Sequence, residues 1–348
     1  MRAPAANPRE PRRHHYVPRL LMKRFAVERR PGQFQIQAFD KSNDRVFATA
    51  IENIAVESDF NALERDGVRV SLEAGMGKIE SAAAEPIARI VQGGTLVGMT
   101  MEDRAAIDLF CALQFARGTG MRAQFSALAE GVEARARAIV GADARLDLVG
   151  DAEGMKAAAL QLIVGSLLEF TGRFNDKDLL LLQAIEGEDF LLGDNPVAMQ
   201  NARQFGPYGN IGLGVPGIEI YMPISSRFSL AYWCPTLLHQ MREGAALADQ
   251  RLLQARAMSV VGQGVTRAAA LAALPEIEAL RARLRRIPDG HLAGAAVAAD
   301  AGNVTRLNSL QVRWAERFVM SRDGGFDIAR RMIADDSAFR QGMRPRLD

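Results

Sequence analysis

The spacing of apolar residues along the chain predicts mostly helices. From residue 71 to Gly93-Gly94 the apolar positions follow three- and four-residue steps, which is helical periodicity, and Pro86 is placed to bend this helix. Thr100, with Asp103 three residues later, predicts the start of the next helix by a near capping box. The same periodicity predicts further helices at about 121–140, 153–171, 236–256, 264–285 and 303–321.

Alternating or short apolar runs predict strands in two regions of the chain. Residues 34–39 alternate apolar and polar side chains, residues 40–44 have turn chemistry, and residues 46–49 return as a second strand, which predicts a hairpin. A short helix at 19–26 can begin behind Pro18. Later runs predict strands at 179–185, 190–192, 218–223 and 228–233, with a long Gly- and Pro-rich loop at 205–217. We therefore expect an α+β fold that is predominantly helical, with two small clusters of β-strands.

Composition adds little to this picture beyond one charged segment. The chain has 348 residues, 48% of them hydrophobic, and a net charge of +2, so we expect a flexible basic arm at 1–13 and a single domain at 14–348. Nine Arg and Lys residues against two Glu in residues 1–30 could contact phosphates or remain solvated. The chain lacks a membrane span, a secretory signal and paired cysteines, so the expectation is cytoplasmic.

Two adjacent histidines are the most unusual feature of the N-terminal region. His14 and His15 lie before Tyr16-Val17-Pro18 and are half of the four histidines in the chain. Imidazole can bind metal, transfer protons or contact phosphate. In an extended segment the two rings point to opposite sides, so one could face a pocket. The alternative is that both pack beneath the short helix that follows.

A second candidate group follows the apolar run 190–192. Asp194 at the end of a buried strand would project into a crevice, as catalytic carboxylates and metal ligands do, with Asn195 beside it. Asp-Asn-Pro is also an ordinary turn, in which both side chains bond to local backbone.

Two further groups lie on helices. Gln114 and Arg117 share a helix face, and Arg117 needs a carboxylate or an anionic ligand if it is buried. Glu73 and Glu80 are seven residues apart and could bind a divalent ion, although a solvated acidic face is the common outcome. The sequence has none of the common nucleotide-binding, zinc-protease or serine-hydrolase motifs.

These residues together resemble the bacterial domain-of-unknown-function family 4238. The resemblance covers residues 14–322 and rests on the His-His-Tyr-Val-Pro opening, the two glutamates, the Gln-Arg pair and the Asp-Asn-Pro segment, to which it adds Asn308 and the strand-like end 317–319. The chain departs from the family at Phe60-Asn61 and Leu192-Gly193. The resemblance implies that these distant polar residues form one pocket, and it implies no particular reaction.

Three functions are compatible with such a pocket. The first is a metal-dependent hydrolase of phosphate-containing substrates, with nucleic acid among the candidates, and with Mg²⁺ or Mn²⁺ held by Asp194, His15, Glu73 and Glu80. In that enzyme His14 or His15 and Asp194 would be catalytic, and Arg117 would stabilise charge on the phosphoryl group. The second is a non-enzymatic module with a signalling or defence role, which binds a small anion or nucleotide through Gln114, Arg117, Asn195 and Asn308. The third is a hydrogen-bond network that only fixes the fold.

Overall fold

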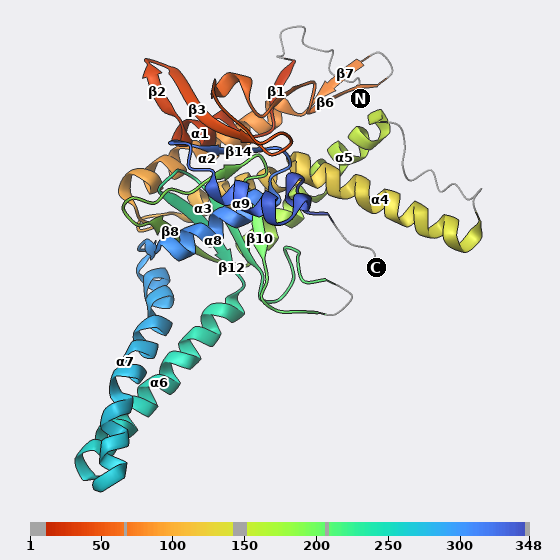
Figure 1. Cartoon of the computed structure of the whole chain (residues 1–348). Coiled ribbons are helices and arrows are strands. Elements are labelled where there is room, and N and C mark those ends of the chain that lie inside the picture. The colour runs from red at the N-terminus through yellow and green to blue at the C-terminus, as the bar shows by residue number, and fades with distance from the viewer. Residues whose placement is uncertain (1–11, 66–67, 142–151, 206–208, 345–348) are drawn as a thin grey trace.

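The chain forms a mostly helical α+β structure from which a long helical hairpin projects (Figure 1). The computed structural model describes residues 12–65, 68–141, 152–205 and 209–344. The expected basic arm, residues 1–13, lies outside these ranges except for Arg12 and Arg13. The largest hydrophobic core cluster runs from Tyr16 to Met320, so both ends of the described chain contribute to one core.

The N-terminal region contains the predicted hairpin. β3 (Gln33–Asp40) pairs antiparallel with β4 (Arg45–Ala50) from Gln35 onward, which confirms the prediction from alternating residues. The predicted short helix is also confirmed as α1 (Arg19–Met22) with a 3₁₀ turn behind it. Five other strands in this region were not predicted, namely β1 (Arg13–His15), β2 (Val27–Arg30), β5 (Val56–Ser58) and the hairpin β6–β7 (Ala62–Arg65, Val68–Ser71).

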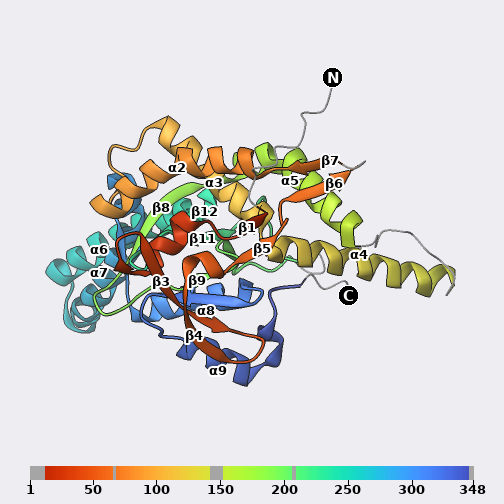
Figure 2. The same ribbon diagram turned by 90° about the horizontal axis from the view of Figure 1, so that it is seen from above.

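Four helices follow, and three of them pack together. α2 (Glu73–Gly93) ends at Gly94, whose φ of +63° suits glycine, and α3 (Met101–Arg117) begins with the predicted Thr100–Asp103 capping box. α3 packs against α2 and α5 (Ala152–Asn175), while α4 (Thr119–Val140) projects away from the body (Figures 1 and 2).

The central sheet has the order β10-β11-β12-β8-β13. Three of its strands were predicted within a residue or so: β8 (Asp178–Ala184), β11 (Glu219–Pro223) and β12 (Phe228–Trp233). β12 is buried along its whole length. The sheet edges are β10 (Ala198–Gln200) and β13 (Val297–Ala299), and β13 runs parallel to β8.

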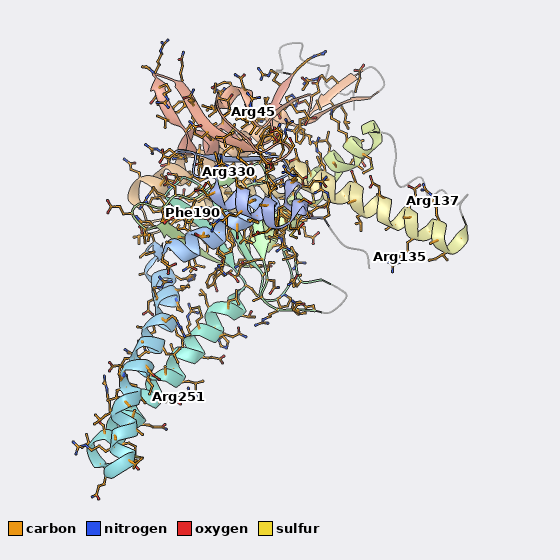
Figure 3. The ribbon with its side chains drawn as sticks, in the orientation of Figure 1. Arg45, Arg135, Arg137, Phe190, Arg251 and Arg330 are labelled. Atoms are coloured by element: carbon orange, nitrogen blue, oxygen red, sulfur yellow. The ribbon has the colours of Figure 1, made fainter. Side chains whose placement is uncertain are left out.

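The projecting hairpin consists of α6 (Pro235–Val261) and α7 (Gly264–Ala293), both predicted from periodicity but longer than expected. The two helices run side by side away from the body, in a different direction from α4 (Figures 1 and 2). Side chains such as Arg251 on the hairpin and Arg137 on α4 lie far from Phe190 in the body (Figure 3).

Two sequence-based boundaries are wrong at the C-terminal side of the fold. The helix expected at 303–321 is α8 (Ala301–Trp314), and the chain then turns into β14 (Phe318–Ser321), as the family resemblance suggested. The strand expected at 190–192 pairs only at β9 (Leu192–Gly193), because the Phe190 and Leu191 amides donate instead to Ser226 and the Asn308 side chain. β14 lies between β3 and β9 in a second sheet, and α9 (Asp327–Asp335) follows. No described helix is long and apolar enough to cross a membrane.

Candidate functional site

Arg117 is the last residue of α3, and it is one of the largest fully buried side chains of the described chain. Its Nη1 lies 2.6 Å from Oε1 of Glu80 on α2, and its Nη2 donates to Oε1 of Gln114, 3.1 Å away on the preceding turn. A buried guanidinium needs such a carboxylate, since an unpaired charge in the interior is costly. The packing of α2 on α3 therefore brings Glu80, Gln114 and Arg117 together.

Several polar atoms at the α3–α4 junction have no hydrogen-bond partner. Six buried side-chain polar atoms of the described residues lack a partner, and four of these belong to residues 114–122: Gln114 Nε2, Arg117 Nε, Thr119 Oγ1 and Arg122 Nε. A buried donor without a partner costs about 1–3 kcal/mol, and native proteins contain few of them. We call these four residues the Arg117 cluster. Its unmet donors are of the kind that a bound anion or ordered water satisfies.

Arg122 on α4 connects this cluster to the N-terminal strands. Its Nη2 donates to the Phe60 carbonyl at 2.7 Å, and its guanidinium carbon lies 3.5 Å from the centre of the Phe60 ring. Burial lowers the pKa of Arg122 to about 10, against an opposing effect of Glu57. The group stays charged at neutral pH, so Arg122 provides a partly desolvated cation beside the Arg117 cluster.

His14 is held next to Glu73 by Asn61. The Asn61 backbone amide donates to His14 Nδ1 at 3.0 Å, and the Asn61 side chain donates to Glu73 Oε1 at 2.6 Å. The His14 and Glu73 side chains approach to 3.7 Å, and Arg69 Nη2 lies 3.2 Å from His14 Nε2. Arg122 Nη2 also lies 3.4 Å from Asn61 Oδ1, so this group adjoins the Arg117 cluster.

Asn195 reaches the same junction from the other half of the chain. Its Oδ1 accepts from the Gly120 amide at 3.1 Å, and its Nδ2 donates to the Trp314 carbonyl at 2.9 Å. A Cβ at Gly120 would lie 1.7 Å from Nδ2, so the absence of a side chain there makes room for the amide. Gln114 and Asn195 also line a cavity of about 10 Å³, which is at the lower limit of the space that one water molecule needs.

A family comparison covers all of these residues. The family model described as a protein of unknown function, DUF4238, matches residues 13–325. The chain belongs to this family. Neither the curated proteins nor the solved structures contain a match to the chain. The DUF4238 match includes every residue singled out from the sequence, from His14 to Asn308.

Asp194 has another set of partners in this DUF4238 chain. Its carboxylate accepts from the backbone amides of Glu316, Arg317 and Phe318 at 2.7–2.9 Å. Burial raises the pKa of Asp194 to about 6, while these three hydrogen bonds oppose the shift. These contacts anchor the segment that leads from α8 into β14, which explains why the helix expected at 303–321 ends early.

Asn308 and His15 likewise bond to backbone. Asn308 accepts from the Leu191 amide and donates to the Asp189 carbonyl, and His15 Nε2 lies 3.2 Å from the Ile51 carbonyl. Burial lowers the pKa of His15. Asp194, Asn308 and His15 therefore all have backbone groups as hydrogen-bond partners.

The metal set expected from the sequence is therefore not brought together. Asp194, His15, Glu73 and Glu80 each have a different partner, and the described residues contain no group of three or more His, Cys, Asp or Glu side chains that could hold a metal ion. Sequence reasoning also missed Asn61, Arg69 and Arg122. Arg122 could not be assigned from the sequence, because its contact with Phe60 joins segments about sixty residues apart.

Proposed function

We propose that the Arg117 cluster binds the phosphate group of a small molecule such as a nucleotide. The observation that carries the proposal is the concentration of unpartnered donors at residues 114–122. The guanidinium Nε–H, the amide Nε2–H₂ and the threonine hydroxyl can all donate, and a phosphate oxygen accepts several such bonds at once.

The local charge supports an anionic ligand. Glu80 neutralises Arg117, whereas Arg122 donates to neutral oxygens of Phe60 and Asn61. One uncompensated guanidinium beside neutral donors favours an anion, and Arg geometry suits phosphate. A bound phosphate would also accept hydrogen bonds from the donors of the Arg117 cluster that have no partner in the described residues.

The test is calorimetric titration with inorganic phosphate and with nucleoside mono- and diphosphates, in the presence of a chelator. We expect at least one nucleotide to bind wild-type protein and to bind Gln114→Leu about tenfold or more weakly. That variant removes the Nε2 donor and the Oε1 acceptor of Arg117 Nη2, and it keeps the pair between Arg117 Nη1 and Glu80. Gln92→Leu, at an exposed position on α2, is the matched control. If none of these ligands binds the folded wild type, the proposal is wrong.

Metal-dependent hydrolysis of a phosphate ester is the second candidate. It is favoured by the partly exposed carboxylates of Glu73 and Glu80, which lie two turns apart on α2. Glu73 accepts a hydrogen bond from Asn61, and Glu80 accepts one from Arg117. Incubating the protein with nucleotides and a short oligonucleotide in Mg²⁺ or Mn²⁺ separates the two candidates. A hydrolase releases product that disappears on chelation, whereas a binding module gives binding without turnover.

A further inference from the structure

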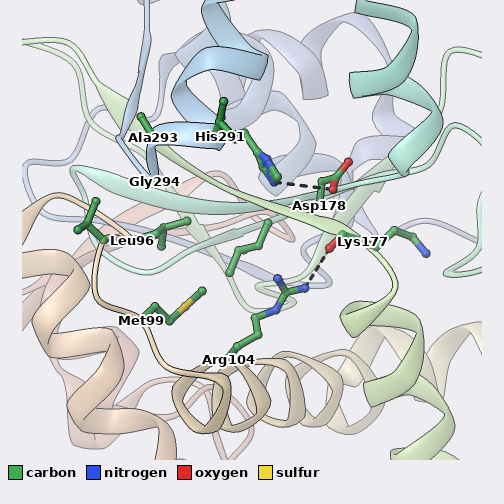
Figure 4. Close-up of a pocket in the computed structure, with 11 residues that line it drawn as sticks. Leu96, Met99, Arg104, Lys177, Asp178, His291, Ala293 and Gly294 are labelled. Atoms are coloured by element: carbon green, nitrogen blue, oxygen red, sulfur yellow. Dashed lines mark hydrogen bonds and ion pairs between the residues drawn. The ribbon is translucent and has the colours of Figure 1, made fainter. Parts of the chain in front are cut away.

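A second polar site lies away from the Arg117 cluster, in a cavity of about 410 Å³ (Figure 4). Its walls come from the loop before α3, the first turn of α3, the start of β8 and the end of α7. Leu96, Met99 and Leu179 give it apolar surface, and Arg104, Asp178 and His291 give it charge and hydrogen-bonding groups. The volume lies in the range of small-molecule sites.

Arg104 is fixed at one side of this cavity. Its Nε lies 2.8 Å from both carboxylate oxygens of the buried Asp108, and its Nη2 donates to the carbonyls of Phe174 and Lys177. Its Nη1 makes no hydrogen bond to any residue of the described segments. Figure 4 shows the guanidinium end on the same side as Asp178 and His291. The held guanidinium therefore keeps donors available for a ligand.

Asp178 supplies an opposite charge, and within the described residues its ion-pair partner is His291. Its carboxylate lies 3.7 Å from His291 Nε2, which is too long for a hydrogen bond, and it makes no hydrogen bond within the described residues. Burial lowers the pKa of His291, which favours the neutral imidazole, although Asp178 opposes this shift. The buried His291 Nδ1 also lacks a partner among the described atoms.

Lys177 does not neutralise Asp178 either. Its ammonium donates to the Arg173 carbonyl at 3.1 Å and points away from the cavity in Figure 4, so the residue contributes only its carbonyl here. That carbonyl accepts from Arg104 at 3.0 Å, and Asp178 is the next residue. The Arg104 guanidinium and the Asp178 carboxylate therefore both line the cavity, together with its apolar residues.

We propose that this cavity binds a free α-amino acid with an apolar side chain. The α-carboxylate pairs with Arg104 Nη1, the α-ammonium pairs with Asp178, and the side chain packs on Leu96, Met99 and Leu179. A simple anion would meet repulsion from Asp178, and a simple amine would leave the Arg104 donors unpaired. A zwitterion satisfies both groups.

Calorimetric titration with L-leucine, L-methionine and L-phenylalanine tests the proposal. For the amino acid that binds most tightly, two matched compounds lack one charge each; for leucine these are 4-methylpentanoate, without the ammonium, and 3-methylbutylamine, without the carboxylate. We expect the intact amino acid to bind about tenfold or more tightly than either fragment. If none of the three amino acids binds, or if a fragment binds equally well, the proposal is wrong.

One substitution tests the assignment of Asp178. Asp178→Asn keeps the shape of the side chain and removes the charge, so we expect about a tenfold or greater loss of amino-acid affinity with an unchanged circular dichroism spectrum. Asp176→Asn, at an exposed position two residues earlier, is the matched control and should bind as wild type does. Equal affinity of Asp178→Asn and wild type would contradict the assignment. Gln114→Leu should leave amino-acid binding intact, so this result is independent of phosphate binding at the Arg117 cluster.

Discussion

Asp194 and Asn195 are neighbours in sequence whose side chains stabilise different parts of the molecule. Asp194 holds three consecutive amides before and within β14, and Asn195 joins the α3–α4 junction to the end of α8. Both were singled out from the sequence, because an Asp at the end of a buried strand was expected to project into a crevice with Asn195 beside it. The partners themselves lie 75 to 124 residues away, and no local pattern encodes them.

The contacts of Asp194 predict a large structural effect of a small change. In Asp194→Asn, one carboxylate oxygen that accepts backbone hydrogen bonds becomes an NH₂ group facing amide donors. We expect the free energy of unfolding in urea to fall by about 2–4 kcal/mol. Asp335→Asn, at an exposed position of α9, should change it by less than about 0.5 kcal/mol. An Asp194→Asn protein as stable as wild type would contradict the anchoring role.

The junction of α3 and α4 depends on two glycines more than on helix propensity. A Cβ at Gly118 would lie 2.3 Å from Asn195 Oδ1, and one at Gly120 would lie 1.7 Å from Nδ2. Neither glycine has a positive φ, so what is required is space rather than backbone freedom. This close approach is what lets Asn195 reach the Gly120 amide.

Gly120→Ala should therefore destabilise the protein by about 1–3 kcal/mol in thermal or urea unfolding, because the new methyl group displaces Asn195. Gly77→Ala, in the interior of α2 with no atom near its added Cβ, should instead stabilise it by about 0.5–1 kcal/mol. Adding Gly120→Ala to Asn195→Ala should cost much less than Gly120→Ala alone. Additive effects of the two substitutions would show that the overlap is not the cause.

Element by element, the sequence predicted what depends on near neighbours. The β3–β4 hairpin and β12 were predicted because alternation or an apolar run between turn residues is a local signal. β1 and β5 were missed because each has three residues and the partner lies about forty residues away. Helical spacing through 303–321 could not reveal where α8 ends, because the three backbone amides after it donate to the distant Asp194 side chain.

The candidate sites follow the same division. Gln114 and Arg117 were paired correctly from their three-residue spacing, and the need of Arg117 for a carboxylate was recognised. That the carboxylate is Glu80 depends on how α2 packs against α3. The cavity with Arg104, Asp178 and His291 could not be predicted from the sequence, because it forms where α3, β8 and α7 meet.

At the scale of the whole molecule, the α6–α7 hairpin extends beyond the common core (Figure 1). Near the body Gly244 packs against Leu284, and farther out Asp249 pairs with Arg281 and Arg285. Towards the tip, Val260 and Val265 are 79% and 86% exposed, so the distal part adds little buried apolar surface to the body.

Shortening this hairpin should therefore leave the body folded. Replacing residues 250–280 with a four-residue Gly-Ser turn should keep cooperative unfolding and change Tm by less than about 4 °C, measured by circular dichroism. Arg256→Glu, which breaks the exposed Arg256–Glu278 pair in the full-length hairpin, is the control for changes confined to the arm. Loss of cooperative unfolding in the shortened chain would mean that the distal hairpin supports the core.

The position of β14 between β3 and β9 also has a consequence for synthesis on the ribosome. Residues 318–321 must insert beside residues 37–40, so the sheet stays open until residue 321 has emerged. Pairing across such a sequence separation is slow, because loop-closure entropy must be overcome first. The N-terminal hairpin of the nascent chain would meanwhile expose an unpaired edge to other chains, and a chaperone that covers this edge would raise the yield of native protein.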